Sequence, residues 1–271
     1  MKENQKYDDI KKYWDERAKK NVNTTKITTD DFYMRSIEYD QVKNAIESVH
    51  QNVFKIADFG CGDGLTTIKI ADNFKEKEII GLDYSYEMIK IAKKNRERSN
   101  FKNVSFECKD IFKDKINHKF DLVYTTRCLI NLPFEYMQYE AISKIHEMLN
   151  DDGFFIMVEN FIDGHNEFNS LRKKFNLEGI PIRDHNLYFN QDMLLDKVKQ
   201  QFDLLSISNI SSLYYIVSRV VYSKICFLEN KKPDYLDVHH QLASELPVCG
   251  NYGPIKMIIF KKIKGGNNYE F

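Results

Sequence analysis

The sequence predicts an α/β protein with a doubly wound, mostly parallel sheet and helices on both faces. Short apolar runs alternate with segments of helical periodicity between residues 53 and 160. Such alternation is typical of crossover units, and near-continuous apolar runs fit parallel strands buried on both faces. A glycine-rich turn follows the first run and leads into a helical segment. In doubly wound sheets, ligands bind at this position.

The elements are expected in a regular order along the first half of the chain. The expected strands are residues 53–59, 78–83, 104–108, 120–125 and 153–159. Apolar residues at helical spacing predict helices between these strands, including residues 65–74 and 137–148.

The second half is less regular. We expect helices over residues 167–175 and from the N-cap Asn190 to residue 201, and strands over 202–207 and 255–263. Residues 214–227 are apolar and fit either a helix or a strand, and His165 beside Gly164 is expected on a loop.

Composition excludes several classes of protein. Forty basic and forty acidic residues leave no net charge, which argues against a nonspecific nucleic-acid binder. Residues 1–12 are polar, and the apolar stretches fall far short of the ~20 residues that cross a bilayer. The five cysteines are scattered without a CxxC pair, as expected of reduced thiols. We therefore expect a soluble cytoplasmic protein with no metal site and no membrane or nucleic-acid partner.

The glycine-rich turn, residues 58–64, reads Asp-Phe-Gly-Cys-Gly-Asp-Gly. Glycine permits positive φ and close approach of a ligand to the backbone. The G-x-G-x-G spacing differs from the G-x-G-x-x-G of dinucleotide folds, which disfavours a dinucleotide-dependent oxidoreductase. Asp58 and Asp63 would repel a phosphate at the helix N-terminus. The same acids suit a ligand with a cationic amino group.

Two further acids follow the next strands. Asp83 ends the second expected strand, where its carboxylate can accept hydrogen bonds from both hydroxyls of a ribose. Tyr84 and Met88 follow, positioned to pack on an adenine face. Asp110 comes after the third strand and can accept a hydrogen bond from the adenine amino group, next to Ile111.

These residues together resemble the class I S-adenosylmethionine-dependent methyltransferases over residues 13–160, and less clearly to residue 262. The resemblance implies a Rossmann-like, seven-stranded sheet with an elaborated C-terminal region. It also implies S-adenosylmethionine as cofactor and S-adenosylhomocysteine as product. Residues 13–18 look like the N-terminal helix that closes over the cofactor in many members. The implied cofactor contacts are Tyr13, Arg17, Asp58, Gly60, Gly62, Gly64, Asp83, Tyr84, Met88, Asp110, Ile111 and Thr125.

We expect one methyltransferase domain over residues 1–271, because no linker-like stretch divides the chain. Residues 1–50 would form a helical cap, 51–160 the cofactor-binding half, and 161–271 the substrate-side half with the last strands.

The methyl acceptor should lie beyond the fourth and fifth strands. His185 is our candidate general base and Arg183 an anion clamp, with Arg127 standing where many relatives carry a histidine. The candidate substrate-binding residues are Asn131, Glu159, Asn160, Tyr188 and Arg219. The histidines are too sparse to suggest a metal site.

Residues 214–219 and 246–254 look like segments of methyltransferases from bacterial surface-polysaccharide (capsule) pathways. This looser resemblance implies a small, anionic acceptor: a sugar, a sugar nucleotide or a phosphate-bearing precursor such as a phosphoramidate. Three arginines in the expected cleft fit such an anion, and transfer to oxygen is favoured over nitrogen.

Other activities remain open from the sequence. An N-methyltransferase acting on an amino sugar, RNA or protein is one, although the Asn/Asp-Pro-Pro-Tyr signature is absent after the fourth strand. A non-catalytic cofactor-binding module is another, disfavoured by polar residues in the expected acceptor pocket. The acceptor, the methylated atom and the oligomeric state are not fixed by the sequence.

Overall fold

The computed structural model describes residues 2–21 and 27–265 and contains a seven-stranded sheet in the order β3-β2-β1-β4-β5-β7-β6. The first five strands are parallel, and β7 runs antiparallel between β5 and β6. This sheet confirms the predicted fold class. The strands are β1 (Lys55–Phe59), β2 (Glu78–Asp83), β3 (Val104–Cys108), β4 (Phe120–Thr126), β5 (Leu149–Asn160), β6 (Phe202–Asn209) and β7 (Ile255–Lys262).

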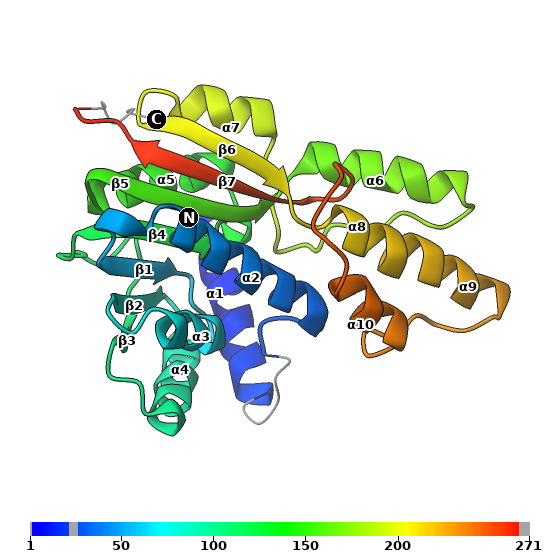
Figure 1. The fold of residues 1–271 in the computed structure, drawn as a ribbon, viewed down its shortest axis with the longest axis horizontal. Helices are drawn as coiled ribbons and strands as arrows, with labels where there is room; N and C mark the ends of the chain where they lie inside the picture. Colours follow the sequence, from blue (N-terminus) through cyan, green and yellow to red (C-terminus); the bar gives the residue numbers. More distant parts are fainter. Residues whose placement is uncertain (1, 22–26, 266–271) are drawn as a thin grey trace.

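Helices cover both faces of the sheet (Figure 1). Alternate strand residues such as Ile56 and Ala57 belong to two different apolar clusters, one on each face. The first cluster includes α2 (Phe32–Ser48), α3 (Leu65–Asn73) and α4 (Tyr86–Ser99). The second includes α5 (Glu135–Met148) and α7 (Gln191–Val198). Helix α1 (Lys2–Lys20) packs on α4 through Ala18 and Trp14.

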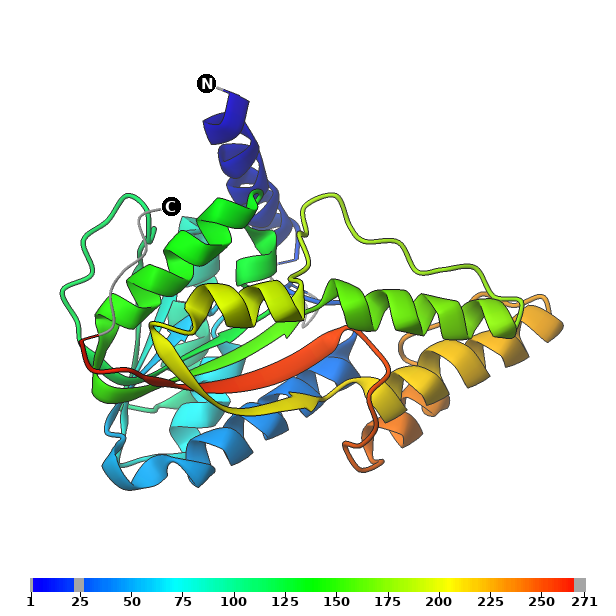
Figure 2. The ribbon, with the colours of Figure 1, turned by 90° about the horizontal axis from the view of Figure 1, so that it is seen from above.

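The remaining helices form a lobe beyond the carboxyl ends of the parallel strands, which we call the C-terminal lobe. It consists of α6 (Ile162–Lys174), α8 (Ser212–Tyr215), the π-helical turn η3 (Ile216–Val221), α9 (Tyr222–Leu228) and α10 (Val238–Ser244). Figures 1 and 2 show α6 and α9 running out from the sheet together, and Phe168, Leu177 and Val220 form an apolar cluster of their own in this region. Residues 214–227, left open from the sequence, are therefore helical.

Several boundaries differ from the prediction. Helix α6 begins at Ile162 instead of residue 167, because Phe161 leaves β5 straight into the helix and Asp163 in its first turn is held by Lys256. His165 is consequently on a helix and not on a loop. Strand β5 begins at Leu149 instead of residue 153, with a register shift against β4 and a left-handed φ at Asp152 in its first part. Asn190 caps α7 as predicted, but that helix ends at Val198.

Within the described ranges, no helix combines the length and hydropathy needed for a membrane crossing.

Candidate active site

A cavity of about 280 Å³ lies at the carboxyl ends of the parallel strands. The glycine loop after β1 and Asp83 at the end of β2 line one part of it. The segment after β4, the start of α2 and the C-terminal lobe line the other. We call these parts the cofactor half and the acceptor half.

The glycine loop turns sharply at each glycine. Gly60, Gly62 and Gly64 have φ of 79°, 54° and 72°, a region that residues with a side chain rarely adopt. A Cβ on Gly60 would lie 2.1 Å from Cys128 Sγ, and one on Gly62 would lie 2.7 Å from a methyl carbon of Thr28. Gly60 and Gly62 line the cavity. Gly64, at the start of α3, packs against Phe106 of β3 instead.

Asp83 is fixed by two backbone groups. Its Oδ2 accepts a hydrogen bond from Gly62 N at 2.9 Å, and its Oδ1 accepts one from Ser85 N at 2.8 Å. Each carboxylate oxygen keeps a second lone pair, so both could still accept a ribose hydroxyl. Burial raises the pKa of Asp83 from 3.8 to about 6.

One carboxylate oxygen of Asp110 has no hydrogen-bond partner among the described residues. Its Oδ1 accepts hydrogen bonds from Tyr7 Oη at 2.9 Å and Phe112 N at 3.1 Å. Its Oδ2 is buried without a hydrogen-bond partner among the described residues, and Lys113 Nζ lies 4.0 Å away. An amino group such as the N6 of adenine would satisfy this oxygen. Asp110 does not itself line the cavity, but its neighbours Lys109 and Ile111 do. The glycine loop and this unpaired oxygen behind the cavity wall fit S-adenosylmethionine.

The two acids of the glycine loop have separate surroundings. Asp58 is buried against the cavity, accepts a hydrogen bond from Thr67 Oγ1 at 2.6 Å, and has its pKa raised to about 6 by burial. Asp63 instead forms a bidentate ion pair with Arg35 of α2, at 2.5 and 3.1 Å. The expectation that both acids face a cationic ligand is therefore wrong for Asp63, because Arg35 of α2 is its cationic partner.

Some predicted cofactor contacts lie outside the cavity. Tyr84, Met88 and Ile111 line it, but Thr125 is fully buried within β4. Arg17 donates to Ile27 O at 2.6 Å and pairs with Asp30, so it holds the segment before α2. Tyr13 stacks on His185 with ring centroids 4.5 Å apart. Helix α1 turns Tyr7 and Trp14 toward the cavity in place of Tyr13 and Arg17.

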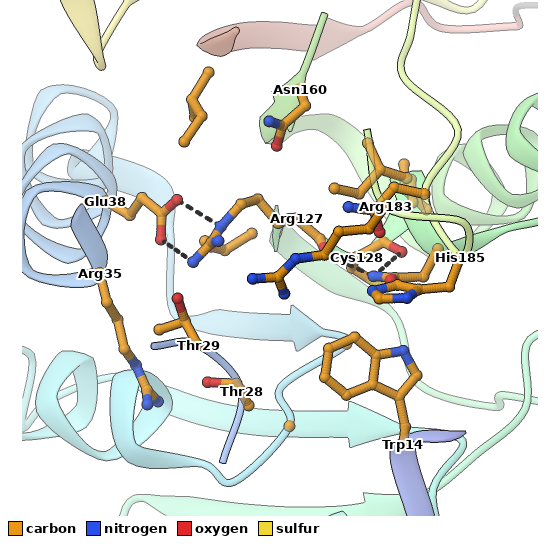
Figure 3. A pocket seen from close by; sticks show the side chains of 18 of the residues that line it. Trp14, Thr28, Thr29, Arg35, Glu38, Arg127, Cys128, Asn160, Arg183 and His185 are labelled. Atoms are coloured by element: carbon orange, nitrogen blue, oxygen red, sulfur yellow. Dashed lines mark hydrogen bonds and ion pairs between the residues drawn. The ribbon is translucent and has the colours of Figure 1, made fainter. Parts of the chain in front are cut away.

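In the acceptor half, two of the three predicted arginines are already paired. Arg127 Nε lies 2.7 Å from Oε1 of the buried Glu38, and its Nη2 lies 3.0 Å from Oε2 (Figure 3). Arg219 forms an ion pair with the buried Asp31 and lies between the rings of Tyr215 and Tyr235. The expectation that all three arginines fit an anionic acceptor is thus wrong for Arg127 and Arg219, because Glu38 of α2 and its N-cap Asp31 neutralise them.

Glu159 was expected to bind substrate and does not line the cavity. Its carboxylate accepts hydrogen bonds from the backbone N–H groups of Cys128, Leu129 and Ile130, at 3.0, 3.0 and 3.3 Å. It caps the short helix η2 (Leu129–Asn131). Burial raises the pKa of Glu159 to about 7. This residue holds the turn after β4 in place.

The other predicted acceptor-site residues meet at the cavity: Arg183, His185, Asn131, Asn160 and Tyr188. The Arg183 side chain is 50% exposed, and its nearest acidic partner, Asp30, is 3.9 Å away. Burial, reinforced by Arg183 and Arg17, lowers the pKa of His185 below 6.5, so its imidazole is neutral at pH 7. Figure 3 shows Arg183 and His185 above Trp14.

Sequence reasoning missed several lining residues. They are Tyr7, Trp14 (seen only as part of the N-terminal helix), Thr28, Asp31, Glu38 and Cys128, and His165, which we expected on a loop. Most come from the N-terminal 50 residues, where no motif distinguishes them from an ordinary helical cap. Only the buried charge of Glu38 among apolar neighbours on α2 could have given a signal.

Comparison with known proteins agrees with this geometry. Residues 50–179 match a family described as "Methyltransferase domain". Malonyl-[acyl-carrier protein] O-methyltransferase of Bacillus anthracis is 24% identical over 166 residues, which cover 54% of this chain and 59% of that protein. Release factor glutamine methyltransferase of Buchnera aphidicola is 37% identical over 82 residues, 30% of each chain. The chain spans about half the length of the curated relatives it matches.

Solved structures share the fold over most of the chain. The N-methyltransferase NodS of Bradyrhizobium japonicum WM9, in complex with S-adenosylhomocysteine, has a TM-score of 0.55 at 12% identity. That alignment covers 92% of this chain and 98% of NodS. Magnesium protoporphyrin IX methyltransferase from Synechocystis PCC 6803, with bound S-adenosylhomocysteine, has a TM-score of 0.55 at 14% identity and covers 83% of this chain and 82% of that one.

The fold and the matched segment define a class. Residues 50–179 match a methyltransferase domain, and the solved structures that share the fold include methyltransferases with bound S-adenosylhomocysteine.

Proposed function

We propose that the chain, as one domain over residues 1–271, transfers a methyl group from S-adenosylmethionine to a small molecule. One observation carries the proposal. The glycine loop and Asp83 open into the same cavity as Arg183 and His185, so a cofactor and an acceptor could meet there. All five cysteines are free, which supports a cytoplasmic location.

The acceptor we favour carries a hydroxyl group and one acidic group. A neutral imidazole at His185 can take the hydroxyl proton, and Arg183 is the arginine of the acceptor half whose charge is least compensated. A sugar that carries one phosphate, or another phosphate-bearing polysaccharide precursor, has both groups, and methylation of oxygen follows from the base. A sugar nucleotide has both groups but more than one phosphate, so it ranks below these. Because Arg127 and Arg219 are neutralised, an acceptor with several phosphates is disfavoured.

S-adenosylmethionine supplies the electrophilic methyl group, and the protein must align the acceptor with it and exclude water. Asp83 and Asp110 would hold the ribose and adenine, and Asp58 would face the amino group. Stacking on Tyr13 fixes the ring of His185, while Trp14 meets the same ring edge-on at 5.7 Å. These contacts hold the base in one orientation, and Arg183 would hold the acidic group of the acceptor.

A carboxylate acceptor is a second candidate, since it is already an anion and Arg183 alone would position it. The relatives named malonyl-[acyl-carrier protein] O-methyltransferases bring this chemistry into consideration. Nitrogen acceptors in an amino sugar, RNA or protein rank lower, because no basic face for RNA is evident in the balanced composition.

The test uses S-adenosylmethionine labelled on its methyl carbon. The protein is incubated with matched panels of phosphorylated sugars, sugar nucleotides, carboxylic acids and amino sugars, and transfer is scored by scintillation counting. We expect transfer to a hydroxyl-bearing acid that falls about 100-fold or more in His185→Ala. Transfer that is unchanged in both His185→Ala and Arg183→Ala would refute the assigned roles. Absence of S-adenosylmethionine binding by calorimetry would refute the activity itself.

A further inference from the structure

Helix α2 contributes an arginine to the cofactor half. The Arg35 side chain is 14% exposed and lines the cavity together with Gly62. In Figure 3, Glu38 points from α2 toward Arg127, whereas Arg35 extends away from that pair. A Cβ on Gly62 would lie 2.7 Å from Thr28 Cγ2, so the segment that precedes α2 lies against the glycine loop. Arg35 is therefore placed beside the glycine loop and not in the acceptor half.

Three hydrogen bonds hold the guanidinium group of Arg35. Its Nη1 and Nη2 donate to the two carboxylate oxygens of Asp63, at 3.1 and 2.5 Å, and its Nε donates to Thr66 Oγ1 at 3.4 Å. Asp63 is fully buried and also accepts a hydrogen bond from Leu65 N at 3.2 Å. A guanidinium group has five N–H donors, so one on each Nη atom is left without a partner among the described residues. The group is held in one position and still has donors for a ligand.

The methionine part of S-adenosylmethionine carries an ammonium group and a carboxylate on the same carbon atom. Asp58 would face the ammonium group, so the donor for the carboxylate must lie near Asp58. Burial raises the pKa of Asp58 to about 6, and the charge of Arg35 acts against this rise, so the two side chains interact electrostatically. Both of them line the cavity. An acid and an arginine are thus placed where the two charges of the methionine part require them.

The other lysine and arginines of the cavity wall lie elsewhere. Among the described lining residues, Lys109 follows β3, beside the acid assigned to adenine. Arg127, Arg183 and Arg219 belong to the acceptor half. Arg35 is the arginine that adjoins the glycine loop, through its pair with Asp63.

The pairing of Arg35 with Asp63 suits this ligand. S-adenosylmethionine has a net positive charge because of its sulfonium group, so an uncompensated arginine beside it would repel the cofactor. The carboxylate of Asp63 cancels the charge of Arg35 and leaves N–H groups that can donate. An anionic acceptor needs a net positive charge instead, which the paired Arg127 and Arg219 do not provide.

We propose that Arg35 donates hydrogen bonds from the remaining N–H groups of Nη1 and Nη2 to the carboxylate of the methionine part, and that Asp63 is a positioning residue that orients Arg35. The aspartate of the glycine loop then acts on the cofactor through a residue of α2. This inference rests on S-adenosylmethionine as the cofactor, as the proposed function does, and not on the identity of the acceptor.

Three ligands separate the carboxylate from the rest of the cofactor: S-adenosylhomocysteine, its decarboxylated analogue, and methylthioadenosine, which lacks the whole amino-acid group. Calorimetry measures their affinities. Arg35→Met should weaken S-adenosylhomocysteine binding about 10- to 100-fold, as for a hydrogen bond to a charged group, and should not weaken binding of the other two. Arg98→Met removes an exposed arginine of α4 and should change none of the three affinities.

Arg35→Met leaves Asp63 buried without its cation, which destabilises the fold. The double variant Arg35→Met/Asp63→Asn removes both charges and should show the same selective loss of S-adenosylhomocysteine affinity. Asp63→Asn alone should also weaken S-adenosylhomocysteine binding, by less than Arg35→Met, and leave methylthioadenosine binding unchanged. Equal weakening of all three ligands in the double variant would show that the pair only supports the fold, and would overturn the proposal.

These measurements require no methyl transfer. A selective loss in the variants, combined with no transfer to any acceptor by the unmodified protein, would refute the proposed function and leave the contact of Arg35 standing. An equal loss for all three ligands, in a protein that does transfer methyl groups, would refute the contact alone. No binding of S-adenosylhomocysteine to the unmodified protein would refute both.

Discussion

Glu38 of α2 and Arg127 after β4 form a bidentate ion pair across the acceptor half, although 89 residues separate them in the chain. Glu38 is 1% exposed and the Arg127 side chain 27% exposed, with a positive φ of 49° at Arg127. Both residues line the cavity, and the pair removes one arginine from anion binding. The contribution of this ion pair to the free energy of unfolding can be measured.

Glu38→Gln should destabilise the fold by about 3 kcal/mol, because it leaves a mostly buried guanidinium without its carboxylate. The double variant Glu38→Gln/Arg127→Met should recover at least half of that loss, since no buried charge remains unpaired. Urea unfolding followed by circular dichroism provides the free energies. Lys43→Met, at a partly exposed i,i+4 pair on the same helix, is the control and should change stability little. Additive losses in the double variant would show that the two side chains are not coupled.

The pH dependence of cofactor binding should report Asp58 and Asp83, each with a pKa raised from 3.8 to about 6 by burial. An ionised carboxylate accepts hydrogen bonds better, so affinity for S-adenosylmethionine should rise as pH increases through 6 and level off above 7. Below pH 6 each titrating group should cost about tenfold per pH unit. Asp83→Asn should bind weakly and lose part of this dependence. Affinity independent of pH from 5 to 7.5 in calorimetry would contradict the prediction.

The same two groups affect stability in the opposite direction. Their folded-state pKa lies above the ordinary value of 3.8, so the folded protein binds protons more tightly than the unfolded chain between pH 4 and 6. Their contribution to the free energy of unfolding therefore decreases as pH rises through that window. Asp58→Asn should reduce this decrease, as measured by urea unfolding at pH 4.5 and 6.5.

Gly60→Ala should destabilise the protein by about 3 kcal/mol, through strain at positive φ and overlap of its Cβ with Cys128. Gly265→Ala is a matched control, because its φ is also positive at 71° but a Cβ there would meet nothing within 4 Å. That control should cost about 1 kcal/mol. Adding Cys128→Gly to Gly60→Ala should restore part of the stability. Thermal unfolding measures the stability of these three variants. Equal losses of stability in the two single alanine variants would exclude the steric explanation.

Tyr7→Phe should weaken binding of S-adenosylhomocysteine by about two- to tenfold, because Tyr7 Oη orients Asp110 through a hydrogen bond of 2.9 Å. Titration followed by Trp14 fluorescence measures the affinity. Tyr86→Phe removes a hydroxyl from a tyrosine that is 65% exposed and should leave affinity unchanged. Unaltered binding in Tyr7→Phe would mean that Asp110 is positioned without α1.

The sequence predicted the features that depend on the residue types of one short segment. The alternation of apolar runs with helical segments predicted the mostly parallel sheet, and the glycines at 60, 62 and 64 allow the left-handed turn that the structure contains. The acids at the ends of β2 and β3 follow from the same logic, since parallel strands bring their carboxyl ends to one edge. Asn190 likewise caps its helix as its residue type predicts.

The tertiary structure decided which of the predicted charges are free. Arg127 and Arg219 were expected, with Arg183, to fit an anionic acceptor. In the structure, α2 and its N-cap place Glu38 and Asp31 against them, across 89 and 188 residues. Glu159, expected to bind substrate, instead accepts hydrogen bonds from backbone N–H groups. His165, expected on a loop, lies on a helix and lines the cavity. A side chain's secondary structure depends on its near neighbours, whereas its ion-pair partner and exposure depend on contacts made only when distant segments pack. The sequence by itself therefore determined the glycine turn and the acids that follow the strands, and packing decided which charged side chains around the cavity are left without a partner.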